Sequence, residues 1–315
     1  MNSRAACLAL VMIASAMMLL PPVVADSGYA TSTRSDLNGV RVAVYVGPDA
    51  LNHSGLALAR LFEWMNATVQ FVTPAEVKGS VLDSVDIIAF PGGYYSSYSR
   101  DLGESGKQKI IDFVRNGGSY FGICGGSIFG ASSLRFFNGS VRLVNEPGNP
   151  MHLTIMHINR TSAGPDLSDC PENVSTMYWT SSYFSPREGA AIIPIALYDY
   201  NDRPGMIALN YGQGTVFLSS PHPEYEEGSN QDGTTFGDEL SDPESEWGVL
   251  LRVSSWLIDA SAVQPTTTNV SPSPSTYTSP DPLTIGLLSV GLVFVTVGFG
   301  FWRWRAMARG SPHSA

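Results

Sequence analysis

The chain has 315 residues, a formal net charge of −10 at pH 7 and 43% apolar residues. This acidic balance argues against nucleic acid as a partner, because nucleic-acid-binding domains carry basic patches. The apolar content is enough for one large core or two small ones.

The first 25 residues have the pattern of a secretory signal peptide. Arg4 supplies the positive start, residues 5–20 the apolar run, and Val23-Val24-Ala25 a small-residue cleavage site. A membrane-spanning anchor is the alternative, but Pro21-Pro22 interrupts the run, which is short for a span. We therefore expect residues 1–25 to be removed and the rest of the chain to be exported.

We expect one folded extracellular domain over residues 38–259. Its first part alternates strands and helices. Apolar runs predict strands over 40–46, 68–72 and 85–90, and apolar residues at helical spacing predict helices over 54–65 and 106–116. This alternation is typical of an α/β fold with a doubly wound, flavodoxin-like and mostly parallel sheet, whose sites lie at the carboxyl ends of strands.

Residues 120–130 (YFGICGGSIFG) predict a short buried strand, a sharp turn carrying Cys124, and a helix. Gly122-x-Cys124-x-Gly126 has the spacing of a nucleophile elbow with sulfur in place of the serine oxygen. Such a strained turn needs neighbours without a Cβ. The N–H groups at the start of the helix would favour a thiolate. Taken alone, the pattern also fits a buried structural cysteine beside a glycine turn.

Residues 134–211 have a different pattern from the first part of the domain. Short β-rich runs are linked by Gly and Pro turns, which predicts an antiparallel extension packed on the main sheet. His152 and His157 are five residues apart in a strand-like run, so they point to opposite faces and are expected to be structural residues rather than metal ligands. We expect no metal and no cofactor.

A second motif follows the strand predicted over residues 215–220. The strand ends in Pro221-His222-Pro223-Glu224, where a histidine and a glutamate two residues apart can supply a base and its orienting carboxylate. The acidic stretch 226–246 is expected to be a solvated lid. An amphipathic helix over 245–258 closes the domain.

With these two motifs, the chain resembles the class I glutamine amidotransferase-like superfamily, whose members carry a Cys-His-Glu triad. Within it, the chain is most similar to the domain named after the N-terminal region of biotin-protein ligases. The small-residue elbow and the Phe90-Pro91-Gly92-Gly93 turn carry that likeness, which extends over residues 38–259.

The resemblance implies a role for each residue of the triad. Cys124 would attack the substrate, His222 would move protons and Glu224 would hold His222. The backbone N–H groups of Gly93 and Gly125 are expected to form the oxyanion hole. These roles predict a hydrolase that acts on an amide or acyl bond of an unidentified small molecule or peptide, through a thioester.

One residue departs from the pattern of true glutamine amidotransferases. Ile128 stands where these enzymes usually carry a glutamine. An apolar side chain cannot hydrogen-bond a glutamine substrate, so we do not expect glutamine hydrolysis. The alternative function is an inactive extracellular binding module that retains the fold.

Six Asn-x-Ser/Thr sequons support an exported, glycosylated domain. They begin at Asn52, Asn66, Asn138, Asn159, Asn173 and Asn269. Removal of the signal peptide would leave Cys124 and Cys170, which we expect to be free thiols.

The C-terminal part predicts a membrane anchor. Residues 263–282 are rich in Ser, Thr and Pro and should form an extended stalk. Residues 283–302 hold 20 residues without a charge, enough to cross a bilayer. A buried core helix is the alternative. The arginines of residues 303–315 predict a cytoplasmic tail, and hence a single-pass type I protein of the cell membrane.

Overall fold

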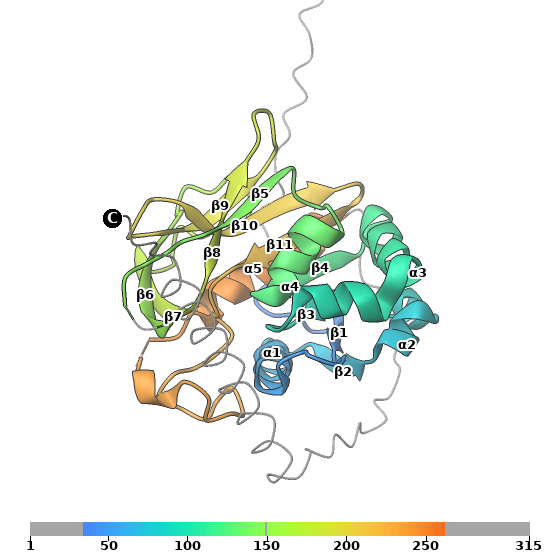
Figure 1. The fold of residues 1–315 in the computed structure, drawn as a ribbon, viewed down its shortest axis with the longest axis horizontal. Coiled ribbons are helices and arrows are strands. Elements are labelled where there is room, and N and C mark those ends of the chain that lie inside the picture. Colours follow the sequence, from blue (N-terminus) through green and yellow to red (C-terminus); the bar gives the residue numbers. More distant parts are fainter. Residues whose placement is uncertain (1–33, 149, 243, 262–315) are drawn as a thin grey trace, which may run out of the picture. The chain divides into compact units, whose positions relative to one another are not determined.

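The computed structural model describes residues 34–148, 150–242 and 244–261 (Figure 1). The predicted signal peptide (1–25), stalk (263–282), transmembrane helix (283–302) and cytoplasmic tail (303–315) lie outside these ranges, as does Asn269. Within the described ranges, no helix is long and apolar enough to span a membrane.

A nine-stranded sheet is the centre of the fold, with the strand order β2-β1-β3-β4-β11-β10-β9-β6-β7. The strands of its parallel half are β1 (Arg41–Tyr45), β2 (Thr68–Val72), β3 (Ile87–Phe90), β4 (Ser119–Ile123) and β11 (Gly214–Ser219). The antiparallel strands are β6 (Met151–Ile158), β7 (Asn173–Trp179), β9 (Ile193–Tyr198) and β10 (Pro204–Tyr211). Numbered along the chain, the parallel half has the order 2-1-3-4-5 of flavodoxin-type sheets.

Helices lie on both faces of the parallel half (Figure 1). They are α1 (Asn52–Trp64), α2 (Pro74–Lys78), α3 (Tyr95–Arg115), α4 (Gly125–Ile128) and α5 (Trp247–Asp259), with the short helices η1 (Val81–Ser84), η2 (Phe129–Ser133) and η3 (Asp238–Leu240). Alternate residues of a strand point to opposite faces. Accordingly, Val42 and Val44 of β1 belong to the core under α1 and α5, while Ala43 and Tyr45 belong to the core under α3.

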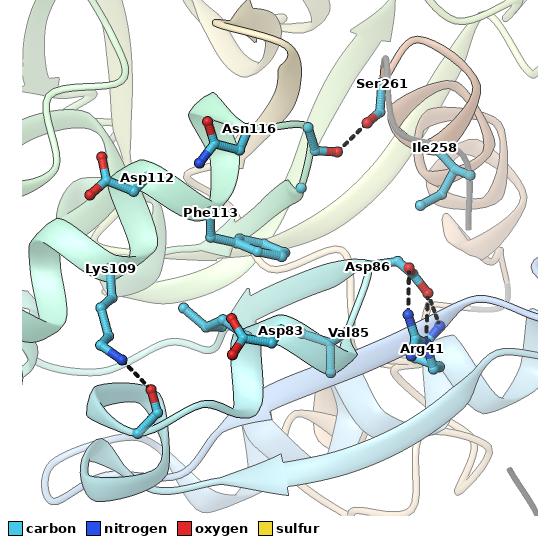
Figure 2. Close-up of a pocket in the computed structure, with 14 residues that line it drawn as sticks. Arg41, Asp83, Val85, Asp86, Lys109, Asp112, Phe113, Asn116, Ile258 and Ser261 are labelled. Carbon is cyan, nitrogen blue, oxygen red and sulfur yellow. Dashed lines mark hydrogen bonds and ion pairs between the residues drawn. The ribbon is translucent and has the colours of Figure 1, made fainter. Parts of the chain in front are cut away.

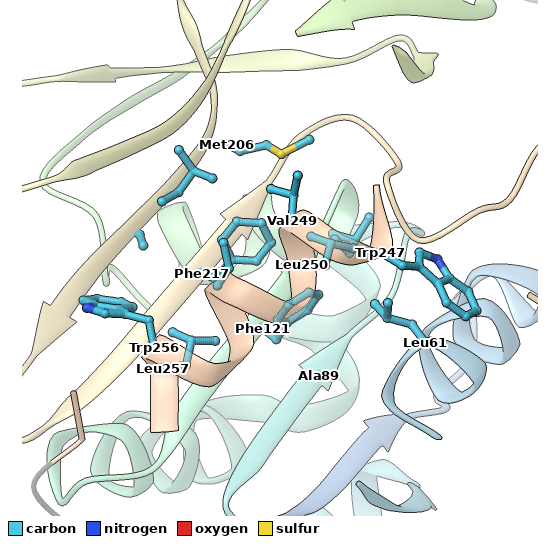
Figure 3. Packing of buried hydrophobic residues seen from close by; sticks show 14 of the residues in the cluster. Leu61, Ala89, Phe121, Met206, Phe217, Trp247, Val249, Leu250, Trp256 and Leu257 are labelled. Carbon is cyan, nitrogen blue, oxygen red and sulfur yellow. The ribbon is translucent and has the colours of Figure 1, made fainter. Parts of the chain in front are cut away.

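The core under α1 and α5 is built from large apolar side chains (Figure 3). Trp247, Leu250 and Trp256 of α5 are buried against the sheet strands that carry Phe121 and Phe217. The amphipathic helix predicted at the end of the domain is therefore present as α5, and its apolar residues face the sheet.

The predicted α/β class, with a mainly parallel sheet and an antiparallel extension, is confirmed. The extension does not pack on the main sheet as predicted; β10, β9, β6 and β7 continue it by hydrogen bonding. The reason is the two-residue connection Gly212-Gln213 between β10 and β11, where Gly212 has φ +63°. Such a tight hairpin fixes β10 as the antiparallel neighbour of β11. Only β5 (Gly139–Leu143) and β8 (Ser182–Pro186) form a separate two-stranded sheet in the described ranges.

Helix α3 begins earlier than the predicted 106–116. It starts at Tyr95 and is interrupted at Gly103, whose φ of 59° and ψ of −174° are not helical. The interruption shifts the apolar periodicity, so the sequence pattern reveals only the second half. In the first half, Tyr98 is fully buried and donates to the Gly92 carbonyl oxygen (2.8 Å). Tyr98 thus supports the Pro91-Gly92-Gly93 turn.

Candidate functional site

The predicted site residues follow three neighbouring strands of the parallel half. β4 pairs with β3 on one side and with β11 on the other, all in parallel. Cys124 comes directly after β4, the Pro91-Gly92-Gly93 turn follows β3, and His222 lies three residues beyond β11. Since parallel strands end at one edge of a sheet, all three segments meet there.

The backbone of Cys124 is strained in the way that a nucleophile elbow requires. Its φ of 49° and ψ of −111° are rare for a residue with a side chain. The Cys124 N–H donates to the Ser219 carbonyl (2.8 Å), and the Cys124 carbonyl accepts from the Ile128 N–H (3.0 Å) and from Ser127 Oγ (2.8 Å). β11 and α4 therefore hold the strained residue from both sides. The Cys124 side chain is half-buried.

The elbow lies in contact with the Pro91-Gly92-Gly93 turn. The Gly126 N–H donates to the Pro91 carbonyl (3.1 Å), and a Cβ on Gly125 would collide with the Gly93 carbonyl oxygen. Only glycine fits at position 125 for this reason. In the described part of the chain, neither the Gly93 N–H nor the Gly125 N–H donates a hydrogen bond to another backbone group. Two donors thus lie beside the cysteine, while their role as an oxyanion hole stays a prediction.

His222 and Glu224 form a fully buried pair. His222 Nδ1 lies 2.9 Å from Glu224 Oε1, and neither residue has any solvent exposure. The His222 N–H donates to the Met177 carbonyl (2.9 Å), which fixes the loop against β7. On the other side of the ring, a Cβ on Gly92 would come within 2.8 Å of His222 Cε1. The imidazole is therefore clamped, and Nδ1 is oriented by the carboxylate.

The second ring nitrogen of His222 is available for chemistry. His222 Nε2 is buried and has no partner of ordinary hydrogen-bond geometry in the described part of the chain. Burial alone would lower the pKa of His222, but interactions with Glu224 and Cys124 outweigh it and raise the pKa to about 10. Because Cys124 contributes to this shift, its side chain lies near the His222 ring.

Ser54 is a site residue that the sequence analysis did not identify. It is fully buried in α1, where its Oγ donates to Glu224 Oε1 (2.7 Å) and accepts from the Gly92 N–H (2.8 Å). One hydroxyl thereby links the carboxylate of the pair to the turn after β3. The available signal was a serine four residues before Leu58, on the apolar stripe of the helix.

Aromatic side chains surround the histidine. The His222 ring lies 5.5 Å from that of Tyr225 and 5.8 Å from that of Trp179. His53 stacks on Phe236 with 3.9 Å between ring centroids. Burial, and then the charge of His222, lower the pKa of His53 to about 4, so His53 is neutral at pH 7. We refer to His53, Trp179, Tyr225 and Phe236 as the aromatic group.

The acidic stretch 226–246 is solvated only in part, because several of its carboxylates are buried. Glu227, Asp232 and Glu246 are each 1% exposed. Asp232 accepts hydrogen bonds from the backbone N–H groups of Thr234 and Glu226, which turn the chain inward. The number of charges in a segment does not reveal local hydrogen bonds between side chains and backbone. For this reason, composition alone did not predict the burial of these carboxylates.

A cavity of about 480 Å³ lies away from these residues (Figure 2). Arg41, Asp86 and Gly118 line it, and they stand at the amino ends of β1, β3 and β4. It is thus at the sheet edge opposite Cys124, and an ion pair between Arg41 and Asp86 occupies one wall (Figure 2). The cavity contains none of the predicted site residues.

The remaining predicted residues are distributed over the surface and the core. Asn52, Asn66, Asn138 and Asn173 are exposed, while the half-buried Asn159 donates its side-chain amide to the Pro194 carbonyl (2.9 Å). Cys124 and Cys170 are both free thiols, as predicted, and Cys170 is buried.

Comparisons of sequence find two relatives. An uncharacterized protein of Chlamydia muridarum is 29% identical over 161 residues, which is 45% of this chain and 62% of that protein. A biotin–protein ligase of Schizosaccharomyces pombe is 25% identical over 217 residues, 59% of this chain and 33% of that enzyme. The chain therefore matches less than two thirds of the length of each.

Comparisons of structure find similar folds. A glutamine amidotransferase from Thermotoga maritima has 17% identity and a TM-score of 0.46, with 69% of this chain and 90% of that one covered. A ThuA-like protein from Bacteroides uniformis has 11% identity and a TM-score of 0.49, with 73% of this chain and 96% of that one covered.

Residues 40–146 match the model of the family described as biotin-protein ligase, N terminal. The predicted resemblance to the N-terminal domain of biotin-protein ligases is thus confirmed for residues 40–146.

Proposed function

We propose that this protein is a cysteine hydrolase that cleaves an amide or related acyl bond. The observation that carries the proposal is the strained backbone of Cys124 beside the buried His222–Glu224 pair. A cysteine that only fills space needs neither a positive φ nor an imidazole with a free nitrogen. Strain, base and orienting carboxylate together are what covalent catalysis needs.

The first half of the proposed reaction forms a thioester. The Cys124 thiolate attacks the substrate carbonyl carbon, a C–S bond forms, and the carbonyl π electrons move to oxygen. The N–H groups of Gly93 and Gly125 would bind that oxyanion. When the carbonyl reforms, the C–N bond breaks and the leaving amine takes a proton from His222 Nε2.

The second half releases the acid. His222 removes a proton from water, the resulting hydroxide attacks the thioester carbonyl, and the C–S bond breaks to give a carboxylic acid and the thiolate. Glu224 stabilises the positive charge on the ring each time it forms. Ser54 is a positioning residue in this scheme, because it acts through Glu224.

Glutamine is not the proposed substrate. Ile128 is half-buried in the turn of α4 that follows the cysteine and has no polar group to bind a carboxamide. We propose instead an amide or acyl compound, either a small molecule or a peptide.

We also propose that the domain is extracellular and held by a single C-terminal transmembrane helix. The apolar runs at 5–20 and 283–302 and the arginines after the second run support this topology. The exposure of four sequon asparagines is compatible with glycosylation and supports this proposal.

A chromogenic ester tests the hydrolase directly. With p-nitrophenyl acetate, we expect acetylation of the Cys124 peptide, detected by mass spectrometry, followed by turnover. Cys124→Ser and His222→Ala should each lower the rate by about 100-fold or more, since the residues act as a unit. Cys170→Ala, the matched control, should retain the wild-type rate.

The second candidate function is an inactive binding module, which Ile128 favours by its departure from the glutamine amidotransferase pattern. In that case acetylation of Cys124 would be slow and equally slow in the His222→Ala variant. Equal rates in wild type and His222→Ala would therefore reject the hydrolase.

A further inference from the structure

Segment 226–246 contains carboxylates that are buried without a partner. No hydrogen bond of ordinary geometry from a described residue reaches either carboxylate oxygen of Glu227 or of Glu246, or one oxygen of Asp242. Glu227 and Glu246 are each 1% exposed and Asp242 is 8% exposed. An unpaired buried carboxylate is so unfavourable that the group usually takes up a proton instead.

The groups that act on these carboxylates are themselves acidic. Burial raises the pKa of Glu227 most, and Asp242, Glu224 and Glu226 add to the effect, so that the pKa reaches about 8. Burial, and then Glu227 and Asp242, raise the pKa of Glu246 well above its usual range, while the Thr176 hydroxyl and the Glu246 backbone N–H act in the opposite direction. No lysine or arginine is among the described groups that shift either pKa.

The two glutamates stand where the segment begins and ends. Residues 226–227 follow the loop of His222, and residues 245–246 lead into α5. The Ser245 hydroxyl donates to the Glu226 carboxylate, which brings the two ends together. We call this junction of 226–227 with 245–246 the neck of the segment.

The body of the segment lies against the candidate site. Phe236 stacks on His53 and lies 5.1 Å from the ring of Trp179. A Cβ on Gly233 would meet side chains of α1, and one on Gly237 would meet Met177 of β7. The segment, drawn in orange in Figure 1, thus reaches from β7 to α1, and its Phe236 packs on His53 and Trp179 of the aromatic group.

We propose that Glu227 and Glu246 form a proton-dependent clasp at the neck, which holds segment 226–246 closed over the aromatic group when protonated and releases it when ionised. A proton fits better than a metal ion, because no three His, Cys, Asp or Glu side chains of the described ranges are grouped to hold one. The clasp does not depend on the hydrolase proposal.

The direction of the pH effect follows from the proton count. Between the ordinary glutamate pKa of 4.5 and the value of about 8 for Glu227, the closed segment binds more protons than the open one. Raising the pH over this range therefore favours opening. Below the ordinary value both states are protonated, and the balance no longer changes.

Hydrogen exchange of the full-length chain between pH 5 and 9 tests the clasp. After correction for the intrinsic pH dependence of exchange, protection of amides in 226–246 should fall by up to about tenfold per pH unit for each proton released, while protection of β1 and β4 should not change. Glu227→Gln/Glu246→Gln carries uncharged side chains of similar shape, so its segment should stay protected at pH 9. Glu239→Gln, an exposed residue of the same segment, is the matched control and should follow the wild type.

Three results would overturn the proposal. Wild-type protection of the segment that does not vary with pH would remove the proton linkage, with no variant required. A Glu239→Gln profile equal to that of the double variant would show a general charge effect. Restored protection at pH 9 on adding Ca²⁺ would assign the carboxylates to a cation rather than to a proton. None of these readouts depends on hydrolysis.

Discussion

Replacing Ser54 by alanine should destabilise the domain well beyond the loss of one oxygen atom. The change removes a hydrogen bond to the Glu224 carboxylate and the acceptor of the Gly92 N–H in the described structure. A hydrogen bond to a charged group contributes about 1.5–3 kcal/mol, and an orphaned buried N–H costs about 1–3 kcal/mol. Because the two effects share one relaxed site, we expect a loss of about 2–4 kcal/mol in the free energy of unfolding.

Ser254→Ala provides a matched control for this substitution. Ser254 is also a fully buried helical serine, but its hydroxyl has no hydrogen-bond partner among the described residues. Its replacement should be neutral or slightly stabilising, since an unsatisfied polar group is removed. Urea unfolding followed by tryptophan fluorescence measures both variants. Equal midpoints for Ser54→Ala and Ser254→Ala would refute the role of Ser54 as a hydrogen-bonding link.

Three further predictions concern reactivity, topology and pH. Iodoacetamide should modify the half-buried Cys124 at least about 10-fold faster than Cys170, because burial and then Asp169 raise the pKa of the Cys170 thiol and thiolates are the reactive form; equal labelling would contradict this. Protease added to intact cells should remove residues 38–259 and spare a tag on the tail, and protection of the domain would reject the type I topology. The stability due to the raised pKa of His222 should be complete below pH 6.5 and decline as the pH rises towards about 10. Glu224→Gln should flatten that part of the unfolding profile, and an unchanged slope would show that Glu224 does not raise the pKa.

A further prediction is that the protein lacks glutaminase activity. Purified protein should release no ammonia from glutamine, because Ile128 offers the carboxamide no hydrogen bond. Turnover of about 1 per second or faster would contradict the inference. Ile128→Gln tests whether one residue is sufficient to restore recognition.

The sequence was informative where a local pattern decides the structure. The strand over 68–72 is found with its predicted bounds, and Cys124 has the backbone geometry that its flanking glycines suggest. The convergence of Cys124 and His222 at one sheet edge followed from parallel topology alone. These features depend on hydrophobic period and turn chemistry, which a single sequence displays.

Features that depend on tertiary contacts were not predictable in the same way. The role of Ser54 arises because α1 brings it between β3 and the His222 loop. Ser54 and its partner Glu224 are 170 positions apart in the sequence. The burial of Glu227 and Glu246 depends on how the segment folds back on itself. Acidic loops are mostly exposed, so composition predicted a solvated segment, and nothing in the sequence singled out Ser54 within its helix.

The arrangement at the edge of β3, β4 and β11 is difficult to explain by packing alone. A strained non-glycine backbone costs about 1–3 kcal/mol, and a buried ionisable pair is often no more stabilising than apolar residues of the same volume. Cys124, His222 and Glu224 combine both costs, and the free Nε2 and the unused Gly93 and Gly125 N–H groups add unsatisfied polar atoms. A fold selected only for stability would remove each of them by a simple substitution. The proposed hydrolase would give these features a function, because a transient oxyanion needs free N–H donors and the base needs a free ring nitrogen before the substrate arrives.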